Sequence, residues 1–312
     1  MKSAHFNDPV AAYDLLAAHY AGISRRRQPY LLSVEREIAA RIPARSRSIL
    51  DIGAGDGIRT ARICTASAIR RVVLVEPSAE MRALGRSHSE LDSRSDSAGK
   101  SAMEIRDVEA SSGGAALVSP GRQPWVGGVT GRIPEGRHQA SDESPHIEIW
   151  PFRAESLPAE SASQRFDVIT CLWNVLGHIA AENRGCTLRA VAQLLNQNGR
   201  FFIDVNHRYN LRAYGSLRTC ARWVRDRLFP GESNGDVLAN WNVGESSIST
   251  YGHVFTHREI VRLATAAGLE LEERIVINYE DGRIQRFAFQ GNLLYVFRRS
   301  SRIDSSSAPQ TS

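Results

Sequence analysis

The sequence of 312 residues contains few cysteines and no long apolar run. No apolar segment approaches the ~18 residues of a membrane span, and the N-terminus lacks a signal-peptide core. We therefore expect a cytoplasmic protein that makes no membrane contact. No C-x-x-C pair is present, so we expect reduced core thiols and not disulfides or metal ligands. The four cysteines are Cys64, Cys171, Cys186 and Cys220.

Metal-binding patterns are also lacking. The one H-x-x-x-H pair, His253 and His257, is interpreted as a strand end followed by a helix start, and no carboxylate cluster accompanies it. We therefore expect no bound metal.

Lysine is nearly absent, because Lys2 and Lys100 are the only ones in a chain whose net charge is +5. The arginine excess is consistent with affinity for phosphates, and equally with the base composition of the genome. Charge alone therefore does not identify a partner. The hydrophobic content of 42% is enough for a substantial core, in one large domain or two small ones.

The most informative segment is Ile-Leu-Asp-Ile-Gly-Ala-Gly-Asp-Gly at residues 49–57. Its apolar start predicts a strand buried in a parallel sheet. Gly53, Gly55 and Gly57 then allow a sharp turn and a close approach of backbone N–H groups to a ligand. Apolar residues at helical spacing follow, so we expect a strand, a glycine loop and a helix.

Two carboxylates indicate what this loop binds. The third glycine comes one residue earlier than in the dinucleotide pattern G-x-G-x-x-G, and Asp51 would repel a pyrophosphate but favour a cationic amino group. About twenty residues later, the apolar run 72–75 ends in Glu76, which can accept hydrogen bonds from both hydroxyls of a ribose. The pattern predicts a nucleoside cofactor that carries an amino group.

These segments resemble motifs I and II of the class I S-adenosylmethionine-dependent methyltransferases, with a domain similar to methyltransferase types 11 and 12. The resemblance covers roughly residues 45–90 and 147–207, and it continues in the segments 153–158, 166–173 and 194–203. It implies an α/β, Rossmann-like fold with a mostly parallel seven-stranded sheet, an antiparallel last strand and helices on both faces. It also implies S-adenosylmethionine as the cofactor.

The resemblance further implies which residues contact the cofactor. Position 153, often an aspartate in this family, is Arg153 here, so the contact to the adenine amine is assigned to Glu155. The complete set of expected contacts is Tyr20, Asp51, Gly53, Ala54, Gly55, Gly57, Glu76, Pro77, Ala154, Glu155 and Leu172.

Candidate catalytic residues follow the fourth and fifth expected strands, because ligands of open α/β sheets lie beyond the carboxyl ends of the strands. Asn174 and His178 are four apart and share one face of a helical turn, while His207 and Tyr209 come after the next strand. A neutral imidazole can take a proton from an amine or a hydroxyl. The alternative is structural: a helix cap or core histidine for His178, and supporting roles for His207 and Tyr209.

We expect residues 1–44 to form an N-terminal helical lid, since Asp8-Pro9 is typical of a helix start and Pro43 ends a second helix. From this lid, Tyr20 and an arginine of 25–27 could reach the cofactor's carboxylate, unless the arginines form a solvated turn. The methyltransferase domain then spans 45–298, interrupted by the serine- and glycine-rich segment 91–146. That segment is predicted to be a disordered insertion or, alternatively, a substrate-recruiting flap, and 299–312 a disordered tail.

The C-terminal part should complete the fold. Residues 211–229 predict one helix whose apolar seam packs on the sheet, and whose arginines could alternatively bind an RNA backbone. Thr256 and Glu259 form a capping-box pattern at the start of another helix. The segments 271–278 and 287–297 match the antiparallel hairpin that the family resemblance implies at the end of the sheet.

Three functions are compatible with the sequence. The first is methyl transfer to nitrogen or oxygen of a small molecule, since 171–178 and 203–210 resemble glycine-type N-methyltransferases. The second is methylation of tRNA, since 251–255 and 290–292 look like the wobble-uridine carboxymethyl methyltransferases. The third is a non-catalytic scaffold, against which Asp51 and Glu76 argue. The oligomeric state cannot be predicted.

Overall fold

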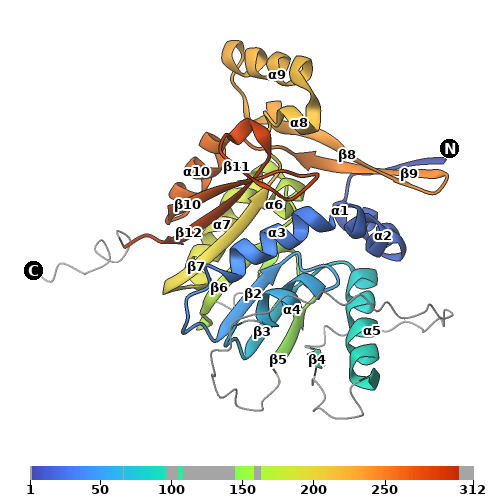
Figure 1. Cartoon of the computed structure of the whole chain (residues 1–312), viewed down its shortest axis with the longest axis vertical. Coiled ribbons are helices and arrows are strands. Elements are labelled where there is room, and N and C mark those ends of the chain that lie inside the picture. The colour runs from blue at the N-terminus through green and yellow to red at the C-terminus, as the bar shows by residue number, and fades with distance from the viewer. Residues whose placement is uncertain (1, 66, 96–104, 108–144, 158–162, 302–312) are drawn as a thin grey trace, which may run out of the picture.

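The computed structural model describes residues 2–65, 67–95, 105–107, 145–157 and 163–301. A nine-stranded sheet forms its centre (Figure 1). Its strands are β2 (Ser48–Ile52), β3 (Arg71–Val75), β4 (Ile105–Asp107), β5 (His146–Trp150), β6 (Phe166–Cys171), β7 (Leu195–Val205), β10 (Leu269–Ile277), β11 (Ile284–Gln285) and β12 (Asn292–Arg299). Their order across the sheet is β11-β10-β12-β7-β6-β2-β3-β5-β4.

The expected α/β fold is confirmed. Strands β4, β5, β3, β2, β6 and β7 pair in parallel, whereas β12 runs antiparallel to both β7 and β10. The predicted number of seven strands is wrong, because the short strands β4 and β11 extend the sheet at its two edges. Strands of two or three residues carry too little pattern to be recognised from sequence.

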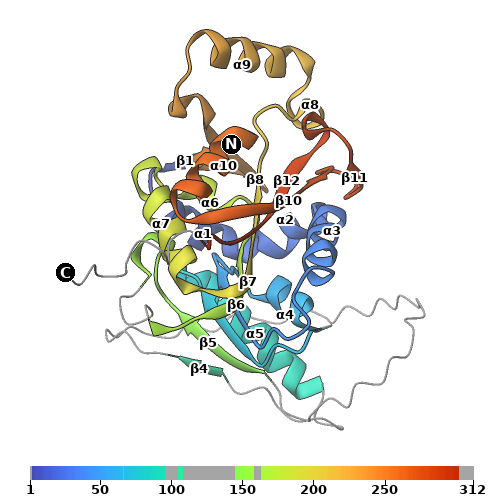
Figure 2. The ribbon, with the colours of Figure 1, turned by 90° about the vertical axis from the view of Figure 1, so that its left-hand side faces the viewer.

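Helices cover both faces of the sheet, as expected (Figure 2). Ile49 on β2 points to the face that is covered by α3 (Gln28–Ala39) and α4 (Ile58–Thr65), where it packs with Tyr30 and Ile63. Leu50, its neighbour, packs on the other face with Leu188 of α7 (Ala181–Leu194) and with α10 (His257–Ala266). This alternation is the two-residue period of a strand that is buried on both sides.

The N-terminal segment starts with an unexpected strand, β1 (Lys2–Phe6). It pairs in parallel with β9 (Ser246–His253), which pairs antiparallel with β8 (Asp236–Val243), so a second sheet of three strands forms. Helix α1 (Pro9–Leu16) packs on this sheet through Ala12 and Leu16, and its N-cap is Asp8, as predicted. Strands β8 and β9 form a hairpin that is closed by Gly244 and Glu245, whereas β1 pairs with a strand far from it in the chain, so no local pattern could predict the pairing of β1.

Three helical segments, α1, the 3₁₀ turn η1 (Ala17–His19) and α2 (Tyr20–Arg26), precede α3. Because α3 packs on the central sheet, it belongs to the main core. The lid function proposed for residues 1–44 therefore concerns chiefly the segments before α3, and it stays a prediction.

Parts of the predicted insertion 91–146 lie in regular structure, which the absence of periodicity did not indicate; the insertion itself stays a prediction. Helix α5 (Ala79–Ser95) continues to Ser95, β4 occupies residues 105–107, and β5 starts at His146. Residues 96–104 and 108–144 lie outside the described part of the chain, as do residues 302–312 of the predicted tail.

The predicted helix 211–229 is broken into α8 (Leu211–Tyr214) and α9 (Ser216–Leu228) at Gly215, whose φ is +77°. The interpretation of its apolar seam as packed on the sheet is wrong. Leu217 is 86% exposed, and Val224 and Leu228 are exposed too. In Figures 1 and 2, α9 lies at the end of the molecule, away from the central sheet.

The four cysteines are free. Cys171 is buried, Cys64 and Cys186 are partly buried, and Cys220 on α9 is exposed, so the expectation of a core thiol is wrong for Cys220. In the part of the chain that the structure describes, no helix combines the length and the apolarity of a membrane span.

Candidate active site

The loop after β2 requires glycine, because its backbone is left-handed and neighbouring side chains pack against the bare Cα atoms. Gly53 has a φ of +70°, and a Cβ there would lie 2.5 Å from a methyl carbon of Val175. Gly55 has a φ of +63°, and its Cβ would lie 3.2 Å from the hydroxyl of Tyr20. The backbone N–H of Gly53 donates to the carbonyl of Val75 at 2.8 Å, which ties the loop to the end of β3.

Glu76, the first residue after β3, is buried beside this loop. Its carboxylate accepts hydrogen bonds from the backbone N–H groups of Gly55 (2.8 Å) and Ser78 (2.9 Å). Burial raises the pKa of Glu76 to about 7, against the opposing effect of these two hydrogen bonds. The side chain is thus held in one orientation and titrates close to neutral pH.

A cavity opens beyond the ends of β2, β3 and β6, and we refer to it as the first cavity. Its lining residues are Pro9, Val10, Tyr13, Tyr20, Gly53, Gly55, Arg59, Val75, Glu76, Pro77, Met81, Arg153, Ala154, Glu155, Leu172, Trp173, Val175, His178 and Ile179. Most residues expected to contact the cofactor are thereby brought together. Three are not among the lining residues: Asp51, Ala54 and Gly57.

Asp51 lies behind the wall of the first cavity. Its side chain is 1% exposed and accepts hydrogen bonds from the hydroxyls of Thr60 and, at 2.6 Å, Thr170. Burial raises the pKa of Asp51. The contact between Asp51 and the amino group of the cofactor stays a prediction. The buried position of Asp51 does not support it directly.

Arg59, which the sequence analysis did not single out, does line the cavity. It is 6% exposed, and its Nη1 is buried without a hydrogen-bond partner among the described residues. A buried guanidinium beside a cavity, with one nitrogen that has no partner among the described residues, is suited to an anionic group of a ligand. Its position two residues after Gly57 could have indicated from the sequence that Arg59 lies near the cofactor.

One wall of the first cavity is formed by residues 153–155, where the sequence departs from the family pattern. Arg153 pairs with Asp8, at 2.6 Å between Nη2 and Oδ2, which ties this wall to the start of α1. Ala154 and Glu155 follow in a 3₁₀ turn, η2 (Ala154–Ser156), and line the cavity.

A second cavity of about 540 Å³ adjoins the first. The residues that line it are Tyr13, Leu16, Tyr20, Ile23, Arg26, Arg27, Trp173, Asn174, His178, Asn206, Tyr214, Arg222, Val237, Leu238, Ala239, Asn240, Trp241, Asn242, Gly252, Val254 and Tyr279. Four ring-bearing residues line both cavities: Tyr13, Tyr20, Trp173 and His178. These rings mark the place where a molecule in one cavity would meet a molecule in the other.

His178 is placed at this junction by α6 (Val175–His178). Its Nδ1 lies 2.9 Å from the backbone carbonyl oxygen of Tyr251, which can only accept, so Nδ1 carries the proton. Nε2 is then unprotonated and accepts from the hydroxyl of Tyr13 at 3.2 Å. Burial lowers the pKa of His178, which keeps the imidazole neutral.

The backbone before His178 is strained. Trp173 (φ +58°) and Asn174 (φ +61°) are both left-handed, and such conformations cluster at functional sites. The buried carboxylate of Asp204 accepts from the backbone N–H of Trp173 and from the hydroxyl of Tyr30 at 2.6 Å. The amide of Asn174 accepts from Asn206 N at 3.0 Å and donates to the carbonyl of His253 at 3.1 Å.

The other two catalytic candidates lie elsewhere. His207 is buried, and burial lowers its pKa to about 4. Its ring packs edge-on against Tyr209, whose hydroxyl donates to Asp226 at 2.5 Å. Neither residue is among those lining the first or the second cavity. Catalytic roles for His207 and Tyr209 stay predictions, without the proximity seen for Asn174 and His178.

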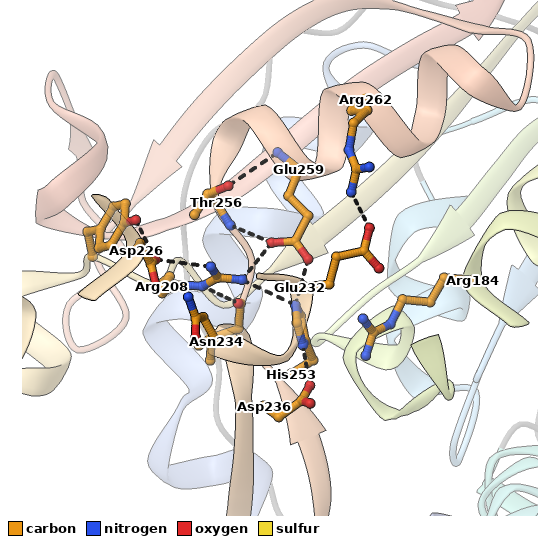
Figure 3. Close-up of polar contacts among 12 residues, drawn as sticks. Arg184, Arg208, Asp226, Glu232, Asn234, Asp236, His253, Thr256, Glu259 and Arg262 are labelled. Carbon is orange, nitrogen blue, oxygen red and sulfur yellow. Dashed lines mark hydrogen bonds and ion pairs between the residues drawn. The ribbon is translucent and has the colours of Figure 1, made fainter. Parts of the chain in front are cut away.

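A buried polar network connects the elements whose residues line the second cavity, namely α9 and the strands β8 and β9 (Figure 3). Arg208 pairs with Asp226 of α9 at 3.0 Å and with Glu259 of α10 at 2.7 Å. Glu259 also contacts Nε2 of His253 at 2.8 Å, and Nδ1 of His253 contacts Asp236 of β8 at 2.7 Å. The second sheet and α9 are thus joined to the main domain. Among the described residues, no His/Cys/Asp/Glu group that could hold a metal is found.

This arrangement of sheet, glycine loop and Glu76 defines a class I methyltransferase. The chain belongs to the methyltransferase domain family, whose model matches residues 24–274, and it is an S-adenosylmethionine-dependent enzyme of that class. No curated protein matches the sequence.

Solved structures share the fold at low identity. An S-adenosylmethionine-dependent methyltransferase from Clostridium acetobutylicum ATCC 824 is 13% identical, with a TM-score of 0.53 over 93% of this chain and 99% of that chain. The CcbJ methyltransferase from Streptomyces caelestis is 14% identical, with a TM-score of 0.51 over 86% and 90%. The glycopeptide N-methyltransferase MtfA, in complex with S-adenosyl-L-homocysteine, is 12% identical, with a TM-score of 0.50 over 86% and 89%.

Proposed function

We propose that the chain transfers the methyl group of S-adenosylmethionine to a nitrogen or oxygen atom of a small molecule. The observation that carries this proposal is the pair of adjoining cavities, which share Tyr13, Tyr20, Trp173 and His178. The second cavity, at about 540 Å³, has the size of small-molecule sites, which hold roughly 300–1,000 Å³.

The residues of the first cavity fit the cofactor. Glu76 offers an anchored carboxylate for the ribose hydroxyls, and Gly53 and Gly55 line the cavity beside it. The unpartnered Nη1 of Arg59 suits the carboxylate of the methionine part. Glu155 and Leu172 are proposed to bind the adenine edge and face.

When bound, the cofactor supplies an activated methyl group, whose bond to sulfur breaks with its electrons staying on sulfur as the bond to the acceptor atom forms. The chain orients the two molecules in line, and such orientation is worth roughly 7–11 kcal/mol. His178 takes the proton of the acceptor at Nε2, directly or through the hydroxyl of Tyr13. The carbonyl of Tyr251 holds the imidazole in the required tautomer.

The decisive test is transfer of a labelled methyl group from S-adenosylmethionine by the purified chain, given a metabolite fraction and an RNA fraction in parallel. Incorporation into the metabolite fraction, abolished in Glu76→Ala when the cofactor is limiting, supports the proposal. Any incorporation excludes the non-catalytic scaffold. Calorimetry that detects no binding of S-adenosylmethionine or S-adenosylhomocysteine would overturn the proposal.

Methylation of tRNA is the second candidate, and one observation favours it. Helix α9 is exposed around most of its surface, and it carries the exposed Trp223 together with Arg218, Arg225 and Arg227, residue types that suit stacked bases and a phosphate backbone. This candidate predicts RNA binding that weakens steeply with salt and on Arg218→Gln. Affinity that stays flat between low and moderate salt would argue against it.

A further inference from the structure

The second cavity has an unbalanced charge. Three arginines line it, Arg26 and Arg27 at the end of α2 and Arg222 on α9, and no acidic side chain is among its described lining residues. A small molecule with negative charge is favoured there, because a cleft lined by one sign of charge concentrates counter-charged ligands.

Two of these arginines are held against aromatic rings. The Cζ of Arg27 lies 4.3 Å from the ring centroid of Tyr279, and the Cζ of Arg222 lies 4.2 Å from that of Tyr214. A guanidinium that lies over an aromatic ring keeps N–H donors available for an anion. Nη1 of Arg222 also donates to the carbonyl of Arg208 at 3.4 Å, which helps to hold this guanidinium in place. Neither arginine forms an ion pair within the described part of the chain, in contrast with Arg208 nearby, which is paired twice.

The part of the cavity near His178 is aromatic. The ring of Trp241 lies 5.8 Å from the ring of Tyr13 and 6.0 Å from that of His178, and Trp173 lines the same space. Flat apolar walls favour a flat ligand, which gains stacking contacts that a flexible chain would not make. His178 and the three arginines thus line the same cavity as these aromatic rings.

We propose that the acceptor is a planar aromatic or heteroaromatic molecule that carries a carboxylate or a phosphate. Its anionic group binds Arg27 and Arg222, its ring stacks between the aromatic walls, and its amino or hydroxyl group faces His178. This inference rests on the proposed function, since it names the substrate class of that same site.

The test measures binding to the full chain saturated with S-adenosylhomocysteine, by calorimetry, with matched ligand pairs. The carboxylate pair is 4-hydroxybenzoate and its neutral amide, and the phosphate pair is pyridoxine 5′-phosphate and pyridoxine. We expect the anionic member of at least one pair to bind roughly tenfold or more tightly than its neutral partner, as hydrogen bonds to charged groups do. The pair that shows the preference identifies the anionic group.

The variants Arg27→Gln and Arg222→Gln should each remove most of this preference. Both arginines line the second cavity and not the first, where an arginine of 25–27 was expected to reach the cofactor, so the affinity for S-adenosylhomocysteine should stay unchanged. Arg218→Gln, an equal charge change at an exposed position one turn earlier on α9 and outside the cavity lining, is the matched control and should have no effect. Unchanged affinity for S-adenosylhomocysteine also shows that each variant is folded.

Equal affinity for both members of each pair, tighter binding of the cation benzylamine, or absence of binding by both anions would overturn the inference and leave the proposed function intact. Salt-sensitive binding of an RNA oligonucleotide that depends on Arg218 as much as on Arg222 would also overturn it, in favour of an RNA substrate. Failure of S-adenosylhomocysteine to bind would instead contradict the proposed function itself.

Discussion

The two cavities differ in how far apart in the sequence their walls lie. The first cavity is built mainly by residues that follow directly on neighbouring strands, such as Gly53, Glu76 and Leu172. The second takes its walls from α1, α2, the β8–β9 hairpin, α9 and the segment after β10. A site made from strand ends is constrained by the sheet, whereas a site assembled from distant segments can vary in shape and charge.

The largest effect is expected at the junction of the cavities. Replacement of His178 by alanine should lower kcat by about 10²–10⁴, because it removes the base that accepts the acceptor's proton. The dissociation constant of S-adenosylhomocysteine, measured by calorimetry, should stay nearly unchanged. His146→Ala, at an exposed histidine on β5, is the control. A joint fall of rate and cofactor affinity would make His178 a structural residue.

The assembly of the second cavity should depend on its buried ion pairs. Arg208→Met leaves the carboxylates of Asp226 and Glu259 buried without their cation, and it should lower the free energy of unfolding by about 3–5 kcal/mol. Denaturant titration provides the measurement. Arg262→Met, which breaks the exposed pair with Glu232, should have a much smaller effect. Equal losses in both variants would contradict the anchoring role of this network.

The first cavity should respond to Glu76. The variant Glu76→Ala removes an acceptor for the ribose hydroxyls and should weaken binding of S-adenosylhomocysteine by about 1.5–3 kcal/mol. Glu80→Ala, which changes an exposed residue of α5 four positions later, serves as the control. A comparable loss of affinity in Asp51→Asn would show that Asp51 affects the cofactor despite its position behind the wall.

The smallest effect concerns pH. Because the pKa of Glu76 is about 7, its carboxylate becomes protonated as the pH falls through neutrality and accepts hydrogen bonds less well. Binding of S-adenosylhomocysteine should therefore tighten as the pH rises to about 7 and level off above it. The change below that point is at most about tenfold per pH unit, since one proton is linked. Glu76→Gln should give a flat profile, and a wild-type profile equally flat would contradict the assignment.

Predictions that depend on neighbouring residues in the sequence succeeded. The capping box of Thr256 and Glu259 and the N-cap at Asp8 are confirmed, because each depends on residues within one turn of a helix. The seam of α9 was misinterpreted, because its period of about 3.6 residues is the same whether the face is packed or exposed. The exposure was decided by Gly215 and by the anchoring of α9 through Asp226.

The sequence by itself determined the strand, the glycine loop and the carboxylate that identify the methyltransferase class, since these lie within short segments whose geometry is local. Only the tertiary structure decided that Asp51 lies behind the wall, that Arg59 lines the first cavity, and that Tyr13 donates to His178. It also decided which arginines line the second cavity, since that depends on contacts between distant segments, such as the contact of Arg27 with Tyr279. The physical reason is that hydrogen bonds and packing between distant segments leave no periodic trace in the chain.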